Sequence, residues 1–178
     1  NDTIVEKDFL NKMIECFERN PEAGVVGGKI LNYYNKDDIE YAGGHIDFFK
    51  FISVHDDFRK VNIDREVGFI TGCLMLIRSE IIKHVGFLSE DYFMYYEDAD
   101  FCTKITKAGY KMIYTPEAII YHKVSRASGG NESDFTIKWN IRNRLIFMNK
   151  YKHEVSTVNF FISCLYFYIT RFARYFFY

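Results

Sequence analysis

The chain has 178 residues, which is enough for one domain of ordinary size and leaves little room for a second. Apolar residues make up 48% and prolines number only 2, which excludes disordered and linker-dominated classes and predicts a buried core. The formal net charge of -1 creates no field for a polyanion, so charge gives no support to a nucleic-acid partner. The 4 cysteines lie far apart without a C-x-x-C pair, which excludes a zinc knuckle and is typical of a reducing compartment.

Hydrophobic spacing predicts the first elements of the chain. Apolar residues between Phe9 and Phe17 recur every three or four positions, which predicts an amphipathic helix that ends before Pro21. The apolar run 25–31 predicts a buried strand. Residues 32–65 are polar and irregular, and we interpret them as a loop-rich insertion with two strand-like pieces.

The middle of the chain predicts one strand and two helices. Residues 73–77 form a continuous apolar run, typical of a central strand that is buried on both faces. Ser79 is placed to cap a short helix over 80–84. A second helix is predicted over 97–108, because Gly109 supplies a left-handed stop.

Strands and helices continue to alternate after this point. Two short strands, 111–114 and 118–121, are predicted on either side of Pro116. A long helix is predicted over 132–151. This alternation predicts an α/β sandwich. The expected inner face of the long helix consists of Phe135, Trp139, Ile141, Leu145 and Met148.

The last segment differs in composition from the rest. Residues 155–170 carry no charge, and Arg171 and Arg174 then alternate with aromatic residues. The uncharged run of about 16 residues is shorter than the roughly 20 that a perpendicular membrane span needs. Two interpretations stay open. The segment is a helix lying on a membrane surface, or it is a helix that packs on a part of the protein outside this chain.

Three carboxylates, Glu97, Asp98 and Asp100, follow an aromatic run at the start of the predicted second helix. Acidic residues in a first turn stabilise a helix through its dipole, so a structural explanation is available. The other explanation is chemical. Like charges beside aromatic bulk raise the affinity of a carboxylate for protons, which suits a general base.

Asp2 and His122 are two further candidates for a site. Asp2 is typical either of a helix cap or of a metal ligand. His122 follows a predicted strand and precedes a polar loop with Ser125, Arg126 and Ser128, so it is either structural or a ligand of a metal or a phosphate.

Taken together, these residues belong to an ordered series of short motifs. The series is Asn1-Asp2-Thr3, Gly72-x-x-x-x-Ile77-Arg78, Val85-Gly86-Phe87, Phe93-x-x-Tyr96-Glu97-Asp98-x-Asp100, Ala108-Gly109-Tyr110, Thr115-Pro116 and His122. With this series the chain resembles the family 2 glycosyltransferases of GT-A fold, especially rhamnosyltransferase-like enzymes. The resemblance implies a GT-A-like three-layer α/β sandwich with a mixed sheet. It also implies an enzyme that moves a sugar, with inversion, from a nucleotide-sugar donor to a saccharide or lipid-linked acceptor in polysaccharide or cell-envelope assembly.

The resemblance assigns the acceptor side of such a site to the second helix. Asp98 matches the aspartate that acts as the family's general base. Glu97, Tyr96 and Asp100 are expected to contact the acceptor.

The donor side is assigned to residues from three separate segments. Asp2 matches the last residue of the family's D-x-D-like motif, and it is expected to bind the donor together with Thr71 and Gly72. Asp2 and His122 are expected to hold a divalent cation, Mn²⁺ or Mg²⁺.

The family's nucleotide-binding half lies on the amino-terminal side of the D-x-D-like motif, and it does not occur here. Residues 1–152 are therefore expected to be the carboxy-terminal part of a GT-A domain, and residues 153–178 an aromatic amphipathic tail helix. The expected location is cytoplasmic, at the inner face of the cytoplasmic membrane where the tail contacts lipid. The alternatives are a non-catalytic carbohydrate-binding or regulatory fragment, and a membrane-associated scaffold that acts through the tail.

Overall fold

The structure is a computed structural model that describes residues 2–56, 62–123 and 133–177, with side chains described as far as Arg171. The elements in chain order are β1 (Thr3–Val5), α1 (Phe9–Arg19), β2 (Ala23–Asn32), β3 (Ile39–Tyr41), β4 (Gly44–Asp47), β5 (Ile52–His55), β6 (Arg65–Glu66), β7 (Met75–Ile77), α2 (Ser79–Val85), α3 (Glu97–Lys107), β8 (Lys111–His122), α4 (Asp134–Tyr151), a 3₁₀ turn (Lys152–Glu154) and α5 (Thr157–Phe177).

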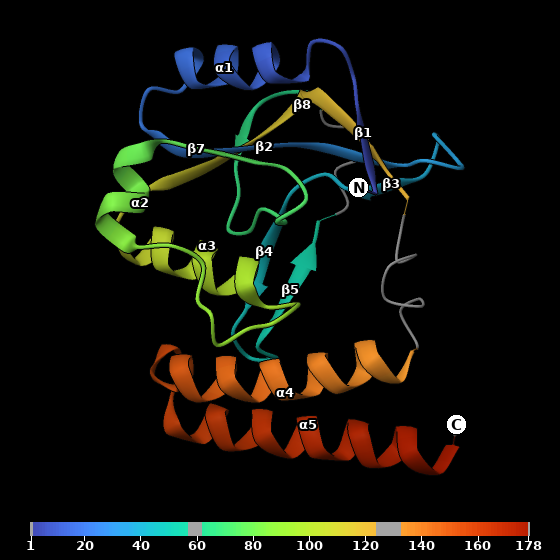
Figure 1. Cartoon of the computed structure of the whole chain (residues 1–178). Coiled ribbons are helices and arrows are strands. Elements are labelled where there is room, and N and C mark those ends of the chain that lie inside the picture. Colours follow the sequence, from blue (N-terminus) through green and yellow to red (C-terminus); the bar gives the residue numbers. More distant parts are fainter. Residues whose placement is uncertain (1, 57–61, 124–132, 178) are drawn as a thin grey trace.

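A mixed sheet organises the described part of the chain. Six of its strands form this sheet in the order β1-β8-β2-β3, with β6 added to β8 and β7 added to β2. β2 and β8 run parallel, whereas the other pairs are antiparallel. Helix α1 covers one face, and α2 and α3 lie on the other (Figure 1). The predicted α/β class with a mixed sheet is therefore confirmed.

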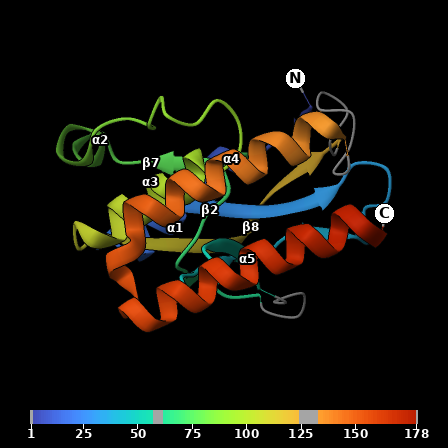
Figure 2. The same ribbon diagram turned by 90° about the horizontal axis from the view of Figure 1, so that it is seen from below.

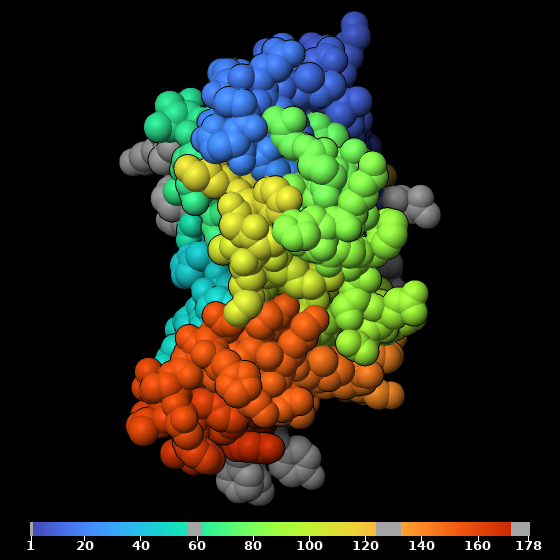
Figure 3. Space-filling view, turned by 90° about the vertical axis from the view of Figure 1, so that its left-hand side faces the viewer, coloured from blue at the N-terminus to red at the C-terminus, as the bar shows by residue number. Residues whose placement is uncertain are grey.

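A further layer, made by α4 and α5, lies beyond α3 and the hairpin β4-β5 (Figure 1). These two helices lie side by side in both ribbon views (Figures 1 and 2). The space-filling view shows α2 and α3 stacked between α1 and this helical layer (Figure 3). The layer buries Phe147 and Phe167 against the same core that receives α3.

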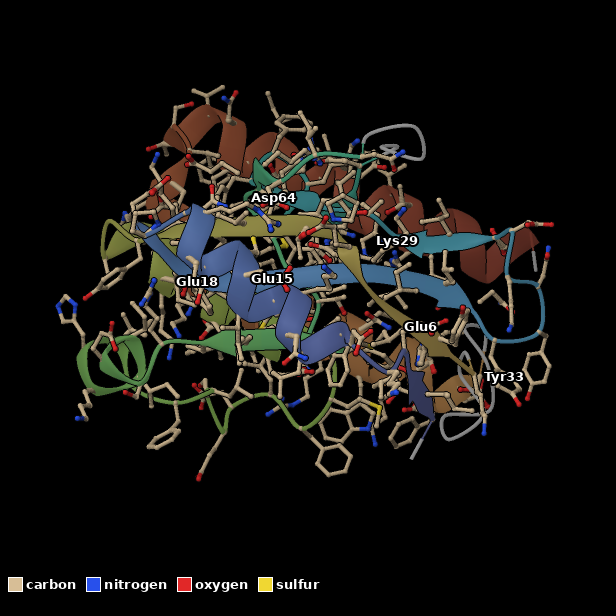
Figure 4. All side chains as sticks on the ribbon, turned by 90° about the horizontal axis from the view of Figure 1, so that it is seen from above. Glu6, Glu15, Glu18, Lys29, Tyr33 and Asp64 are labelled. Carbon is tan, nitrogen blue, oxygen red and sulfur yellow. The ribbon has the colours of Figure 1, made fainter. Side chains whose placement is uncertain are left out.

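Helix α1 confirms the prediction from hydrophobic spacing. Met13 and Cys16 are buried against the sheet and pack with Ile113 of β8. Glu15 and Glu18 lie on the same helix where it crosses over the sheet (Figure 4). The alternation of apolar and charged residues therefore separates a core side from a solvent side.

The prediction of two strands around Pro116 is wrong, because β8 is a single strand of 12 residues. Its pairing with β2 passes from Gly28–Thr115 directly to Lys29–Ile119. Pro116 lies inside this irregularity, where the ladder does not require its missing N–H group. At Gly28 a Cβ atom would come within 2.4 Å of the Ala118 carbonyl oxygen, so glycine permits this close passage.

Two predictions near β7 are also corrected. The run 73–77 is not a central strand buried on both faces, because only Met75–Ile77 is a strand and its side chains are half-buried. Met75 and Ile77 line an open cleft, which explains an apolar run without full burial. Ser79 is the first residue of α2, and the cap position belongs to Arg78.

The predicted inner face of α4 is largely wrong. Phe135 and Leu145 are exposed, and of the expected residues only Met148 is fully buried. The helix instead buries Asn143 and Arg144, because these side chains satisfy backbone carbonyl groups in the elements above. Glu132, where the helix was predicted to begin, lies outside the described residues, and Ser133 caps α4 by accepting a hydrogen bond from the Thr136 N–H.

The tail forms α5, which packs on the protein along one side. Phe167 and Ser163 are buried, whereas Phe161 and Leu165 are exposed. Among the helices that the structure describes, none is long and apolar enough to cross a membrane.

Candidate functional site

A cleft of about 930 Å³ opens beside the first turn of α3. One wall is apolar and is built from β7, α2 and the loop that follows α2. Cys73 lies in the cleft. Six residues that the sequence singled out line the same space, namely Asp2, Thr71, Gly72, Glu97, Asp98 and His122. The fold thus brings together four segments that are far apart in the chain, around residues 2, 71–72, 97–98 and 122.

A left-handed turn aims the start of α3 into this cleft. Tyr95 and Tyr96 have φ angles of 69° and 73°, a conformation that costs a side-chain-bearing residue roughly 1–2 kcal/mol. The buried Asn143 amide of α4 donates to the carbonyl oxygens of Met94 and Tyr95 at 2.7 and 2.9 Å. The Tyr96 hydroxyl donates to the Phe51 carbonyl at 3.2 Å. These bonds hold a strained turn that directly precedes Glu97 and Asp98.

Asp98 is fixed by two backbone groups. Its Oδ2 accepts from the Gly72 N–H at 3.1 Å, and its Oδ1 accepts from the Ala99 N–H at 2.8 Å. Enclosure raises the pKa of the Asp98 carboxyl, and these two hydrogen bonds only partly oppose that rise. An oriented carboxylate with a raised pKa is suited to accept a proton.

Glu97 lies beside it with unused hydrogen-bonding capacity. Its Oε2 is buried and has no hydrogen-bond partner among the described residues. Burial raises the pKa of the Glu97 carboxyl, and the negative charge of Asp98 adds to the effect. A buried acceptor without a donor is unfavourable, so this oxygen is available to a hydroxyl or amide of a ligand.

Gly72 leaves the space next to Asp98 open. Its backbone does not need glycine, since its φ is not positive, and a Cβ would meet Asp98 Oδ2 only at 3.9 Å. The segment before it is held by α3, because Cys102 Sγ donates to the Ile70 carbonyl and accepts from the Ile70 N–H. The Thr71-Gly72 pair is thereby fixed against the first turn of α3.

The other end of the cleft depends on strand register. Thr3 of β1 pairs with His122 at the end of β8, which brings the preceding Asp2 beside the imidazole. His122 Nε2 lies 3.5 Å from Asp2 Oδ2. Because Asp2 precedes a strand and the cap position of α1 belongs to Asp8, the helix-cap explanation of Asp2 is wrong.

Glu40 is a functional candidate that the sequence did not reveal. Its Oε2 lies 2.9 Å from His122 Nδ1. A carboxylate only accepts hydrogen bonds, so the contact with Glu40 requires a proton on Nδ1, and Nε2, on the side of Asp2, is the nitrogen that a cation would bind. A carboxylate that orients a histidine through its second nitrogen is typical of metal sites, so the donor set fits a divalent cation. Among the described residues, no group of three or more His, Cys, Asp or Glu side chains is arranged around one metal position.

The Cys73 thiol lines the cleft and is affected by the acidic residues at both of its ends. Desolvation raises the pKa of its thiol, and the negative charges of Asp2, Asp98 and Glu40 raise it further. Asp2 and Asp98 line the same cleft as Cys73, so the two acidic ends belong to one continuous site.

Two predicted residues lie outside the cleft. Asp100 is completely buried, and its Oδ1 contacts Lys150 Nζ at 2.6 Å and accepts from the Tyr151 hydroxyl at 2.9 Å. Tyr96 packs on Phe147 with 5.5 Å between ring centroids. The structure therefore does not bring these two residues to the space that Asp98 faces. Ser125, Arg126 and Ser128 of the predicted polar loop lie outside the described residues.

Comparisons with known proteins place this geometry among sugar-transferring enzymes. A family model described as glycosyl transferase family group 2 matches residues 1–177. An N-acetylglucosaminyl-diphospho-decaprenol L-rhamnosyltransferase from Mycobacterium tuberculosis is 36% identical over 66 residues, which cover 37% of this chain and 22% of the relative. A poly-beta-1,6-N-acetyl-D-glucosamine synthase from Staphylococcus aureus is 30% identical over 129 residues, which cover 72% of this chain and 30% of the relative.

A solved structure supports the fold. The structure of GalNAc-T7 with UDP, GalNAc and Mn²⁺ superposes with a TM-score of 0.58 at 16% identity, over 83% of this chain and 30% of that one. This likeness concerns the fold alone and confirms the expected GT-A-like architecture. The chain spans less than a third of each of these three proteins.

The left-handed turn yields a prediction about α4. Asn143→Ala leaves two carbonyl groups without their buried donor, so we expect the free energy of unfolding to fall by about 2 kcal/mol or more. Urea unfolding measures this quantity. The control is Asn149→Ala on an exposed position of the same helix, which should change it by no more than about 0.5 kcal/mol. Equal effects of the two substitutions would show that the amide does not hold the turn.

Proposed function

Because this chain belongs to the glycosyl transferase family group 2, we propose that its cleft transfers a sugar from a nucleotide-sugar donor to a hydroxyl group of a saccharide or lipid-linked acceptor. One observation carries the proposal. An oriented carboxylate with a raised pKa, Asp98, shares one cleft with the Asp2–His122 pair. The reaction needs a base for the acceptor at one place and a partner for the leaving diphosphate at another.

Asp98 acts as the general base. Its carboxylate takes the proton from the acceptor hydroxyl while that oxygen forms a bond to the anomeric carbon, and the bond from this carbon to the diphosphate oxygen breaks on the opposite side. This single displacement inverts the anomeric centre. The N–H groups of Gly72 and Ala99 keep the carboxylate in one orientation during the transfer.

Glu97 positions the acceptor. Its buried Oε2 accepts a hydrogen bond from a second hydroxyl group of the sugar, which supplies the missing donor and fixes the attacking oxygen next to Asp98. Gly72 leaves room for the reacting sugar beside the same carboxylate.

Asp2 and His122 would hold a divalent cation, and Glu40 would fix the imidazole ring in the orientation that this requires. Such a cation would supply positive charge against the negative charge that develops on the leaving diphosphate. The fold neighbour solved with UDP and Mn²⁺ supports a divalent cation as the cofactor.

The names of the relatives support the acceptor class. One is a rhamnosyltransferase named for a diphospho-decaprenol-linked sugar, and another is named as a synthase of a glucosamine polymer. The competing proposal is a carbohydrate-binding module without catalysis. It predicts acceptor binding that does not depend on a base.

The base assignment predicts the behaviour of Asp98→Asn. An amide cannot take the proton, so we expect the transfer rate to fall by about 10²–10⁴-fold, the usual contribution of a general base. The variant should stay folded. The pKa of Asp98 is raised above 3.8, its value in an unfolded chain, so ionisation of this carboxyl lowers the stability of the wild-type protein as the pH rises above 3.8. An uncharged amide at the same position avoids this cost. Because the pKa is raised, the acidic limb of the wild-type rate profile should lie above pH 3.8.

The measurement is sugar transfer by the full-length protein, followed by mass spectrometry of the product with a panel of nucleotide-sugars. Asp37→Asn makes the same chemical change at an exposed position and should leave the rate unchanged. Undiminished transfer by Asp98→Asn would remove the base role. Acceptor binding without transfer in the wild-type protein would favour the carbohydrate-binding module.

The cation assignment predicts the effect of Glu40→Gln. Loss of the charged partner of His122 should weaken Mn²⁺ binding by about 10–100-fold, as is typical for groups that orient a metal ligand. Electron paramagnetic resonance of a Mn²⁺ titration measures the affinity. Glu18→Gln on the exposed side of α1 is the matched control and should have no effect. An unchanged affinity in Glu40→Gln would place the cation elsewhere.

We also propose that the outer side of α5 lies on a membrane surface. Val158, Phe161, Leu165 and Tyr168 are each at least 60% exposed. Residues 134–178 contain seven Lys and Arg against two Asp and Glu, whereas residues 1–133 contain sixteen against twenty-two. An apolar helix side in a basic layer suits the surface of an anionic bilayer, and such a position favours a lipid-linked acceptor.

Phe161→Ser tests this position. Loss of an aromatic ring that enters the lipid should weaken binding to phosphatidylglycerol vesicles, measured by sedimentation, about tenfold or more, given roughly 1.5–3 kcal/mol for a fully buried Phe. Ile63→Ser is the matched control, because Ile63 and Phe161 are both 68% exposed and Ile63 lies far from α5 in the chain. Equal vesicle binding by both variants would show that the outer side of α5 does not contact the membrane, and would favour a contact with protein.

A further inference from the structure

A second cavity of about 230 Å³ lies between α4, α5 and the hairpin β4-β5. The two ribbon views show α4 and α5 side by side (Figures 1 and 2). Tyr96 borders this cavity, whereas the adjacent Glu97 borders the cleft. The two spaces therefore lie on different sides of the left-handed turn. The remaining lining residues are Ile52, Ile137, Asn140, Ile141, Arg144, Phe167 and Arg171.

Two guanidinium groups meet in this small space. Arg144 is 6% exposed, and its Nε and Nη2 donate to the Lys50 carbonyl at 3.0 and 2.6 Å. The Cζ atoms of Arg144 and Arg171 lie 4.9 and 5.8 Å from the centroid of the same ring, that of Phe167. The two positive charges thus share one aromatic partner and repel each other.

The positive charge in the cavity is not balanced from within. None of the described residues that line it carries a carboxylate, and within the same part of the chain neither arginine forms an ion pair. The Arg171 Nε atom is buried and has no hydrogen-bond partner among the residues that the structure describes. Desolvation is the largest effect on the pKa of Arg144 and lowers it, and repulsion from Arg171 acts in the same direction, whereas the carboxylate of Asp47, which does not line the cavity, opposes them. Buried charges and donors of this kind require an acceptor with negative charge.

We propose that this cavity binds a phosphate group between Arg144 and Arg171. Guanidinium groups present planar, paired N–H donors that match phosphate oxygens, and Arg171 has its donors still to use. The volume accommodates one phosphate group with a few waters, given about 30 Å³ for each water in the liquid. The site uses none of the residues proposed for sugar transfer, so it stands independently of that function.

The phosphate group has two sources with the same chemistry. One is a phosphate ion or a soluble phosphate ester. The other is the headgroup of an anionic lipid, because α5 carries both Arg171 and the exposed apolar side chains described above.

Isothermal titration of the full-length protein with inorganic phosphate tests the site. Arg171→Gln removes a guanidinium that forms no hydrogen bond within the described residues, so the fold should persist and its thermal unfolding should match the wild type. We expect its Kd for phosphate to rise at least tenfold. Lys152→Gln removes the same charge from an exposed position outside the cavity and should change the Kd by less than twofold. No phosphate binding by the wild-type protein, or equal binding by Arg171→Gln, would overturn the proposal.

Vesicles distinguish the two sources. If Arg171→Gln loses binding to phosphatidylglycerol vesicles, and inorganic phosphate displaces the wild-type protein from them, the cavity takes a lipid headgroup. If vesicle binding is the same in both proteins while the titration still depends on Arg171, the cavity takes a soluble phosphate. Phosphatidylcholine vesicles serve as the control without net charge.

Discussion

The geometry of the cleft depends on a strained turn of two tyrosines. Tyr95 and Tyr96 adopt a left-handed backbone that neither side chain favours, and the Asn143 amide holds the carbonyl groups on either side of the first of them. This turn decides where α3 begins. Helix α3 in turn decides that Asp98 meets the Gly72 N–H and that Asp100 points into the core. Strain of this kind persists only where the surrounding structure supplies compensating bonds.

The other end of the cleft is built by strand pairing rather than by a turn. Asp2 precedes β1, Glu40 is the middle residue of β3, and His122 ends β8. The register of β8 with β1 and β2, and of β2 with β3, brings these three residues together. Each residue contributes one part of a single arrangement, in which a carboxylate orients an imidazole toward a second carboxylate. The geometry of the cleft therefore depends on two separate features, the left-handed turn at one end and the pairing of distant strands at the other.

This difference explains what the sequence could predict. Periodicity predicted α1, the Gly109 stop predicted α3, and a short-range motif singled out Asp98, because those signals involve neighbouring residues. Glu40 escaped notice because only the pairing of distant strands gives it a partner. The buried face of α4 was misjudged because hydrophobicity does not reveal that Asn143 and Arg144 serve carbonyl groups about fifty and ninety residues earlier in the chain. The apolar run before α2 was misjudged because a cleft wall and a buried strand have similar composition.

Asn143 and Arg144 are neighbours in the sequence, yet they serve different spaces, since Asn143 supports the turn at the cleft and Arg144 borders the cavity against α5. Successive residues of a helix are separated by about 100° around its axis, so both contacts depend on one rotational setting of α4. A single inserted or deleted residue in the first turns of this helix would displace both side chains at once. Natural variation in length should therefore be confined to the ends of α4 and to the neighbouring loops, while its interior keeps a constant number of residues.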